Sequence, residues 1–135
     1  MICGERMSTF LNVINLYQAF NEEPTTHNFL KAIMANYILE GIYFYSGFSF
    51  FYTLARQGKM TATSTLFKYI NRDEVTHLVL FQNILKELKK ENPDLFTPAF
   101  EEELREMMRI GVEHEVAWGQ YVTNNQILGL NDALI

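Results

Sequence analysis

The segment INRDEVTHLVLF, at positions 70–81, carries the residues of this sequence whose types and spacing best suit a metal site. Glu74 and His77 are three positions apart, and residues at this spacing lie on one face of a helix. The carboxylate and the imidazole could therefore bind one ion. An apolar stripe runs along this helix from Ile70 through His77 and Leu78 to Phe81, so we expect Glu74 to lie on its buried face. Asp73 could accept a hydrogen bond that orients the imidazole. The same spacing also fits ordinary surface charge, because a lone Glu-x-x-His motif is weak.

Glu40 is a second carboxylate in an unusual setting. Residues 32–55 read AIMANYILEGIYFYSGFSFFYTLA, and Glu40 is the only charged residue among them. The run is long enough to span a membrane, but a carboxylate at the bilayer centre costs roughly 2.5–3.5 kcal/mol. We therefore expect a helix buried inside a bundle, with no membrane partner. A buried carboxylate requires a basic partner, a hydrogen-bonded neutral form or a metal ion, and the residues alone leave these three open.

The elements that must position these residues are all helices. Strand and hairpin signals are weak, and capping residues, prolines and glycine separate the apolar runs. Thr25 and Thr97 are expected to begin two helices, and the hydroxyls of Thr63–Thr65 to cap a third. The helices are expected near residues 5–20, 25–58, 63–91 and 98–123. The sequence thus predicts an all-α bundle of about four main helices in a single domain, 1–135.

Composition and charge exclude some classes of partner. The net charge is −5 and the basic residues are scattered, which argues against a nucleic-acid partner. Cys3 is the single cysteine, and no apolar leader follows Met1, so we expect a cytoplasmic protein. The other two histidines are weaker metal candidates. His27 is expected to be solvated, and His114 to be structural or partly exposed.

Two linked motifs give the chain a family resemblance. ANYILEGIYFYSGF, at 35–48, and INRDEVTHLVLF, at 70–81, resemble the radical-generating small subunit of class I ribonucleotide reductase. The likeness extends upstream through NEEPTTHNFLKAIM and downstream through EHEVAWGQY and GLND. It covers nearly the whole chain, and the two motifs together are far more specific than either alone.

The resemblance implies a ferritin-like homodimer with a dinuclear Fe or Mn site, including mixed Mn/Fe. In the family this site generates an oxidant, commonly a tyrosyl radical, which the large subunit uses to make deoxyribonucleotides. The implied activity is that of a ribonucleoside-diphosphate reductase. By motif, the metal ligands would be Glu40, Glu74 and His77. Phe44, Phe48 and Ile70 would line the radical pocket, and Asp73 would lie on the radical-transfer route.

The chain also departs from the family pattern. It resembles the C-terminal half of the metal-binding core, and Glu74/His77 is its only Glu-x-x-His pair. The remaining ligands, the radical-bearing residue and the tail that docks on the large subunit are expected outside residues 1–135. The missing N-terminal half is thus an expected partner, and the chain is expected to be inactive alone. Two alternatives remain: a metal-binding homodimer that shares six ligands, and a metal-free helical interaction module.

Overall fold

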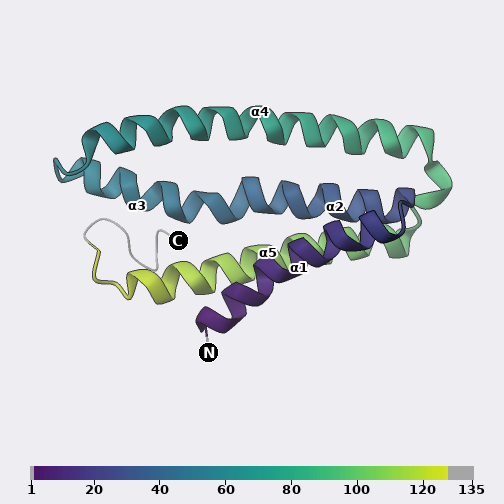
Figure 1. Cartoon of the computed structure of the whole chain (residues 1–135), viewed down its shortest axis with the longest axis horizontal. Coiled ribbons are helices and arrows are strands. Elements are labelled where there is room, and N and C mark those ends of the chain that lie inside the picture. Colours follow the sequence, from purple (N-terminus) through teal and green to yellow (C-terminus); the bar gives the residue numbers. More distant parts are fainter. Residues whose placement is uncertain (1, 128–135) are drawn as a thin grey trace.

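A computed structural model describes residues 2–127 of the chain, and the side chains from Phe10 onward (Figure 1). The described part is helical, so the predicted all-α class is confirmed. The elements are α1 (Ile2–Glu22), α2 (Thr26–Ile38), a π-helical turn η1 (Leu39–Tyr43), α3 (Phe44–Arg56), α4 (Thr61–Glu91), a short 3-10 helix η2 (Pro93–Leu95) and α5 (Pro98–Thr123).

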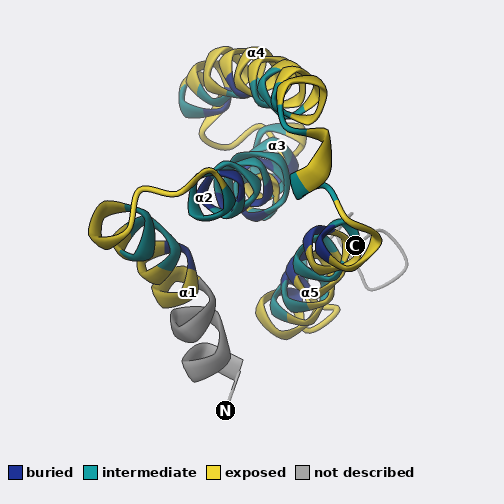
Figure 2. Cartoon of the chain, turned by 90° about the vertical axis from the view of Figure 1, so that its right-hand side faces the viewer, coloured by how far each residue is buried: buried dark blue, intermediate teal, exposed yellow. Residues whose placement is uncertain are grey.

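The helices α2, η1 and α3 form one continuous rod through the middle of the molecule (Figure 1). The long helix α4 runs back along one side of this rod, while α1 and α5 pack on the other side (Figure 2). The apolar run that contains Glu40 therefore occupies the central position predicted for it. No helix in the described part of the chain has both the length and the apolar content needed to cross a membrane.

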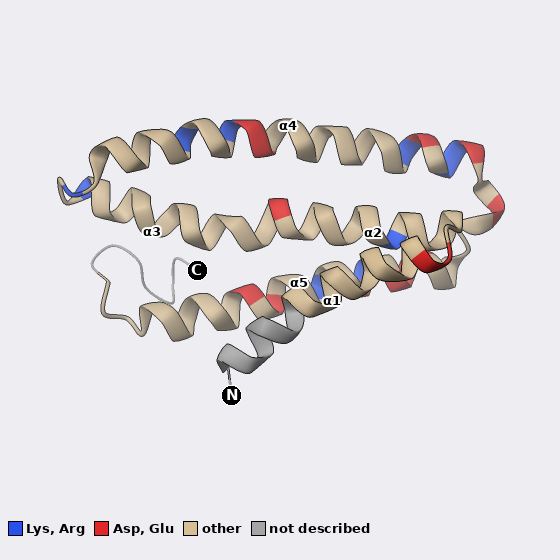
Figure 3. Cartoon of the chain, viewed as in Figure 1, with Lys and Arg blue, Asp and Glu red and all other residues tan. Residues whose placement is uncertain are grey.

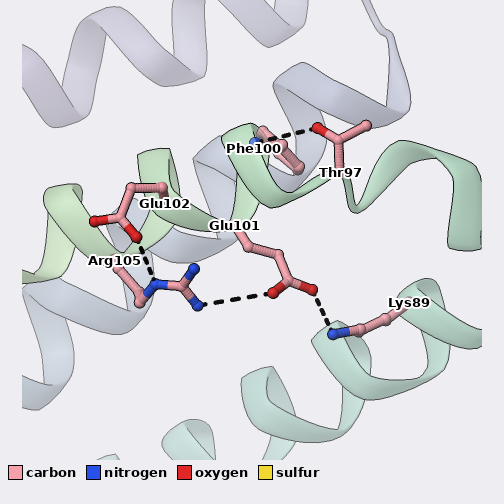
Figure 4. Close-up of polar contacts among 6 residues, drawn as sticks. All are labelled: Lys89, Thr97, Phe100, Glu101, Glu102 and Arg105. Carbon is pink, nitrogen blue, oxygen red and sulfur yellow. Dashed lines mark hydrogen bonds and ion pairs between the residues drawn. The ribbon is translucent and has the colours of Figure 1, made fainter.

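Two of the predicted helix starts are confirmed by their caps. Thr25 Oγ1 accepts a hydrogen bond from the backbone N–H of Asn28 at 3.2 Å. Thr97 Oγ1 accepts one from the backbone N–H of Phe100, also at 3.2 Å (Figure 4). Pro98 then occupies the first turn of α5, where its missing N–H costs nothing.

The predicted cap of α4 is wrong. The helix begins at Thr61, after Met60 in a left-handed conformation with φ 50°, and no side chain caps it. Ser64 N–H already donates to the Met60 carbonyl at 2.9 Å, and Thr65 Oγ1 donates to the Thr61 carbonyl at 3.0 Å. The tight turn that follows α3 thus starts the helix a few residues early, and Thr63–Thr65 lie inside it.

The core lies between the central rod, α1 and α5. Two groups of buried residues form it, one near each end of α2. The first group comprises Val13, Ala35, Ile38 and Tyr43, and the second comprises Leu30, Phe100 and Leu104. Their burial removes apolar surface from water and fixes α1 and α5 against the rod that carries Glu40.

The acidic start of α5 contacts α4 as well as solvent. Lys89 Nζ lies 2.5 Å from Glu101 Oε1, which connects the two helices (Figure 4). Arg105 lies on the same surface, 2.9 Å from Glu102 and 3.7 Å from Glu101. These pairs are largely exposed and screened by water, so they contribute little to stability. The acidic run at the start of α5 is therefore mostly a solvated face.

The outer face of α4 is exposed within the described part of the chain, and it carries large apolar side chains among its polar ones (Figure 2). Ile70 was expected in a buried stripe, but it is 44% exposed, because α4 packs on the central rod with its inner face only. Glu74 lies on that inner face and is buried, as predicted. The large apolar side chains left exposed on α4 are Leu66, Tyr69, Ile70, Val75, Val79 and Leu80.

Candidate metal centre

Glu40 lies in the π-helical turn η1, at the middle of the central rod. A π-turn inserts an extra residue into the helix and changes where the next side chains project, and such turns are frequent at functional sites. In Figure 3, a red acidic segment near the middle of the central rod lies opposite a red acidic segment of α4. A Cβ atom on Gly41 would lie 2.9 Å from Leu78 Cδ2, so the glycine permits η1 to approach α4 closely.

The structure brings together the three sequence-predicted ligands. One atom each of Glu40, Glu74 and His77 lie within 4.8 Å of one another. His77 Nδ1 is 3.2 Å from Glu40 Oε2 and 3.0 Å from Glu74 Oε2. A ring nitrogen carries at most one proton, so Nδ1 cannot donate well to both carboxylates.

The chemistry of these donors fits a metal ion. Glu40 Oε2 is buried, and it has no hydrogen-bond partner among the described residues. The side chain of Glu74 is only 11% exposed, whereas that of His77 is 50% exposed. Two shielded carboxylates that face one imidazole nitrogen are stabilised by a positive charge, which a metal ion or a protonated His77 would supply. Oxygen and imidazole donors together suit iron or manganese better than a structural zinc site.

The two carboxylates perturb His77 in the metal-free chain. The hydrogen bond to Glu74 raises the pKa of His77 above 6.5, and the negative charges of Glu40 and Glu74 add to the rise. A histidine whose pKa is higher in the folded than in the unfolded state stabilises the fold. This contribution is complete below the unfolded-state pKa, and it is lost as the pH rises through the folded-state pKa. We therefore expect the free energy of unfolding of the metal-free chain to fall from about pH 6.5 upward.

Urea unfolding at several pH values measures this loss. A His77→Asn variant should lack it, while His27 and His114 remain in both proteins. The metal affinity should instead rise with pH, because the ion requires the neutral imidazole and must displace its proton. Identical pH profiles for His77→Asn and the unchanged chain would contradict the expected coupling.

Comparison with known proteins places the chain in a family. The family model for the small chain of ribonucleotide reductase matches residues 7–135. The chain belongs to this family. It is 50% identical over 121 residues to the ribonucleoside-diphosphate reductase subunit beta of Treponema pallidum, covering 90% of the chain and 34% of that protein. Its relative in Halalkalibacterium halodurans is 44% identical over 119 residues, covering 88% of the chain and 34% of the relative.

A solved structure gives the same result for the fold. The ribonucleotide reductase R2 subunit from Clostridium botulinum is 78% identical, with a TM-score of 0.85, over 90% of this chain and 38% of that one. The predicted ferritin-like helical fold is therefore confirmed. The chain spans about a third of the length of the curated relatives that it matches, 34% in each of the two above.

The residues that the resemblance places around the radical site occupy different environments. Phe48 is buried and packs against Phe44, with ring centroids 6.4 Å apart. Phe44 directly follows η1, and Phe48 lies about one turn further along α3. Asp73 was expected to orient the imidazole, but its carboxylate is 61% exposed and lies 3.1 Å from Arg72. Ile70 lies on the open face of α4.

Neither of the other histidines joins the cluster of three donors. His27 was expected to be solvated, and its side chain is 39% exposed. Its ring also lies tilted against Phe100, with 4.4 Å between the ring centroids, and Nε2 lies 3.7 Å from Glu103. The apolar surface of Phe100 at the start of α5 explains the partial burial. His114 is half-buried in α5, as predicted.

Sequence reasoning missed two residues beside the cluster. Asn36 Nδ2 donates to Glu40 Oε1 at 3.0 Å, and the Tyr17 hydroxyl donates to Asn36 Oδ1. The four-residue spacing from Asn36 to Glu40 could have indicated the first contact. The second joins residues 19 apart on different helices, so no local pattern contains it.

Proposed function

We propose that this chain forms one wall of the dinuclear metal centre of a ribonucleoside-diphosphate reductase small subunit. Glu40, Glu74 and His77 would be the protein ligands of this wall. The observation that carries the proposal is the convergence of their donor atoms within 4.8 Å from two different helices. Membership of the small-chain family supports the same reading.

The bound metal would be iron, manganese or a mixed pair, and it would supply the one-electron oxidation from which the family's radical arises. The protein's own task is to hold the ligands and limit water. Glu40 and Glu74 supply shielded negative charge, and His77 supplies a neutral nitrogen once its proton has left. Phe48, which is buried, and Phe44 would keep one side of the site apolar.

A second wall would be supplied by polypeptide outside residues 1–135. The chain contains one Glu-x-x-His pair, whereas carboxylate-bridged sites in helical bundles use one from each of two helices. The open apolar face of α4 supports this proposal. Leu66 and Leu80, 63% and 53% exposed, lie on that face with His77 between them in sequence. Helices that carry the other ligands would cover it, and Ile70 would then line the radical pocket.

The wider assembly follows from the family. The complete small subunit would be a cytoplasmic homodimer that passes its oxidising equivalent to the large subunit, which reduces the ribonucleotide. Asp73 would lie on that transfer route, since its carboxylate is accessible and paired with Arg72. By itself the chain would hold metal without reductase activity.

Metal titration tests the proposal. Mn²⁺ at 100 times its dissociation constant should raise the free energy of unfolding of the chain by about 2.7 kcal/mol. Co-expression with the part of a family small subunit that this chain does not cover should raise the stoichiometry to about two ions per site and give a radical signal. A chain that binds no Mn²⁺ alone, and forms no centre when combined, would exclude the proposed site.

The open face of α4 also favours a second candidate, a metal-binding homodimer. Two copies could bury this face against each other and enclose shared ions between two sets of ligands. Sedimentation during the Mn²⁺ titration measures the oligomeric state and so distinguishes the homodimer from the single wall. A metal-dependent dimer without added polypeptide supports the homodimer, and a monomer that holds metal supports the single wall.

A further inference from the structure

The two oxygens of Glu40 have different surroundings. Oε1 accepts a hydrogen bond from Asn36 Nδ2 at 3.0 Å, while Oε2 faces His77. Asn36 precedes Glu40 by four positions, one turn earlier in the same rod, so the contact is local to the helix face. This contact holds the carboxylate in one rotation and leaves Oε2 toward Glu74 and His77.

The orientation of the Asn36 amide is fixed by its two neighbours. Its Nδ2 must point to the carboxylate, because the opposite orientation would place Oδ1 against negative charge. Oδ1 then accepts from the Tyr17 hydroxyl of α1, which can only donate in this contact. Burial and the nearby charge of Glu40 raise the pKa of Tyr17, so the phenol keeps the proton that it donates.

The hydrogen bonds from Tyr17 to Asn36 and from Asn36 to Glu40 form a relay that connects a third helix, α1, to the candidate centre. Tyr17 packs against the buried group of Val13, Ala35, Ile38 and Tyr43, so its hydroxyl has a fixed position. Groups that hydrogen-bond a metal ligand orient it, and their loss typically costs 10–100-fold in metal affinity.

We propose that Asn36 and Tyr17 are positioning residues, which together hold Glu40 so that Oε2 is presented to the metal. The proposal rests on the proposed function, since Glu40 must be a ligand for its position to affect binding. It assigns to α1 a role beyond packing. Through Tyr17, the position of α1 determines how firmly the carboxylate of η1 is held.

Mn²⁺ titration of the complete 135-residue chain tests the proposal. Tyr17→Phe removes a hydroxyl that acts on Glu40 through Asn36. It should therefore weaken Mn²⁺ binding by about 10-fold, the lower end of the range for groups that bond a ligand directly, with unchanged stoichiometry. Tyr37→Phe is the matched control. Tyr37 lies in α2, next to Asn36 in sequence. Its hydroxyl accepts a hydrogen bond from Gln82 Nε2 at 2.9 Å, in an exposed contact outside the relay. Equal affinities for Tyr17→Phe and Tyr37→Phe would overturn the proposal.

A double-mutant cycle tests the relay itself. Asn36→Leu removes both contacts and should weaken binding at least as much as Tyr17→Phe. In that background Tyr17→Phe should change the affinity no further, because the link is already broken. Additive losses of affinity in the double variant would contradict a positioning role. So would a loss of affinity that only follows a lower urea midpoint of the metal-free variants.

Failure of the proposed function gives a separate result. If the unchanged chain and Tyr37→Phe both bind no Mn²⁺, Glu40 is not a ligand in this chain, and the proposed function fails. The same cycle is then measured in the metal-free chain by urea unfolding. Non-additive midpoints for Tyr17→Phe and Asn36→Leu would support the relay, and additive midpoints would overturn it.

Discussion

Replacing Glu74 by alanine is expected to lower the Mn²⁺ affinity of the chain by more than about 100-fold. Removing a group that merely orients a ligand lowers metal affinity by roughly 10–100-fold, and Glu74 is itself one of the three candidate donors. Its loss leaves Glu40 and His77, a set too small to hold an ion against water. Calorimetric titration of the metal-free variant, with circular dichroism to verify the fold, measures the effect.

Glu87→Ala is the matched control for this substitution. Glu87 lies on the same helix and is 63% exposed, and it pairs with Lys90 at 2.6 Å. It has the same charge as Glu74 but lies outside the cluster of donors, so its removal should leave the affinity within about twofold, as for most exposed substitutions. Equal losses in both variants would mean that Mn²⁺ responds to net charge rather than to the site.

The parts of the site that sequence could predict are those determined by local pattern. A single charge in a 24-residue apolar run indicated that Glu40 needs a partner. The three-residue spacing placed Glu74 and His77 on one face of a helix. The caps at Thr25 and Thr97 depend on residues adjacent in sequence and were predicted correctly, whereas the predicted cap of α4 was wrong.

The parts that sequence could not predict depend on contacts between distant elements. The π-turn at Leu39–Tyr43 fits the close approach of Gly41 to Leu78, which only the packed helices define. The contact between Tyr17 and Asn36 requires α1 to lie against the rod. The apolar pattern predicted that Ile70 is buried, but a pattern cannot tell which polypeptide covers a face.

The candidate site keeps its geometry although one side of it is exposed to solvent. The inner face of α4 packs on the central rod and shields Glu74, whereas the outer face leaves His77 half exposed. The core that fixes the rod lies on the other side, with α1 and α5. The part of the fold that carries the three candidate ligands thus has its own packing support. This arrangement allows metal affinity and stability to be changed by separate substitutions.

Leu30→Ala is expected to cause the largest loss of stability among single substitutions of the core. Leu30 has 0% exposed surface and packs against Phe100 and Leu104, where α2 meets α5. Replacing a buried leucine by alanine removes apolar contacts and leaves a cavity, which costs roughly 2–5 kcal/mol. Urea unfolding followed by circular dichroism should show a lower midpoint with little change in slope.

Leu66→Ala provides the control for this loss, because it deletes the same atoms at a position that is 63% exposed. It should change the free energy of unfolding by no more than about 0.5 kcal/mol. Leu30 lies ten positions before Glu40 in the rod, so Mn²⁺ should still bind the folded fraction of Leu30→Ala. A stability loss equal to that of Leu66→Ala would mean that the group of Leu30, Phe100 and Leu104 does not hold α5 to the rod.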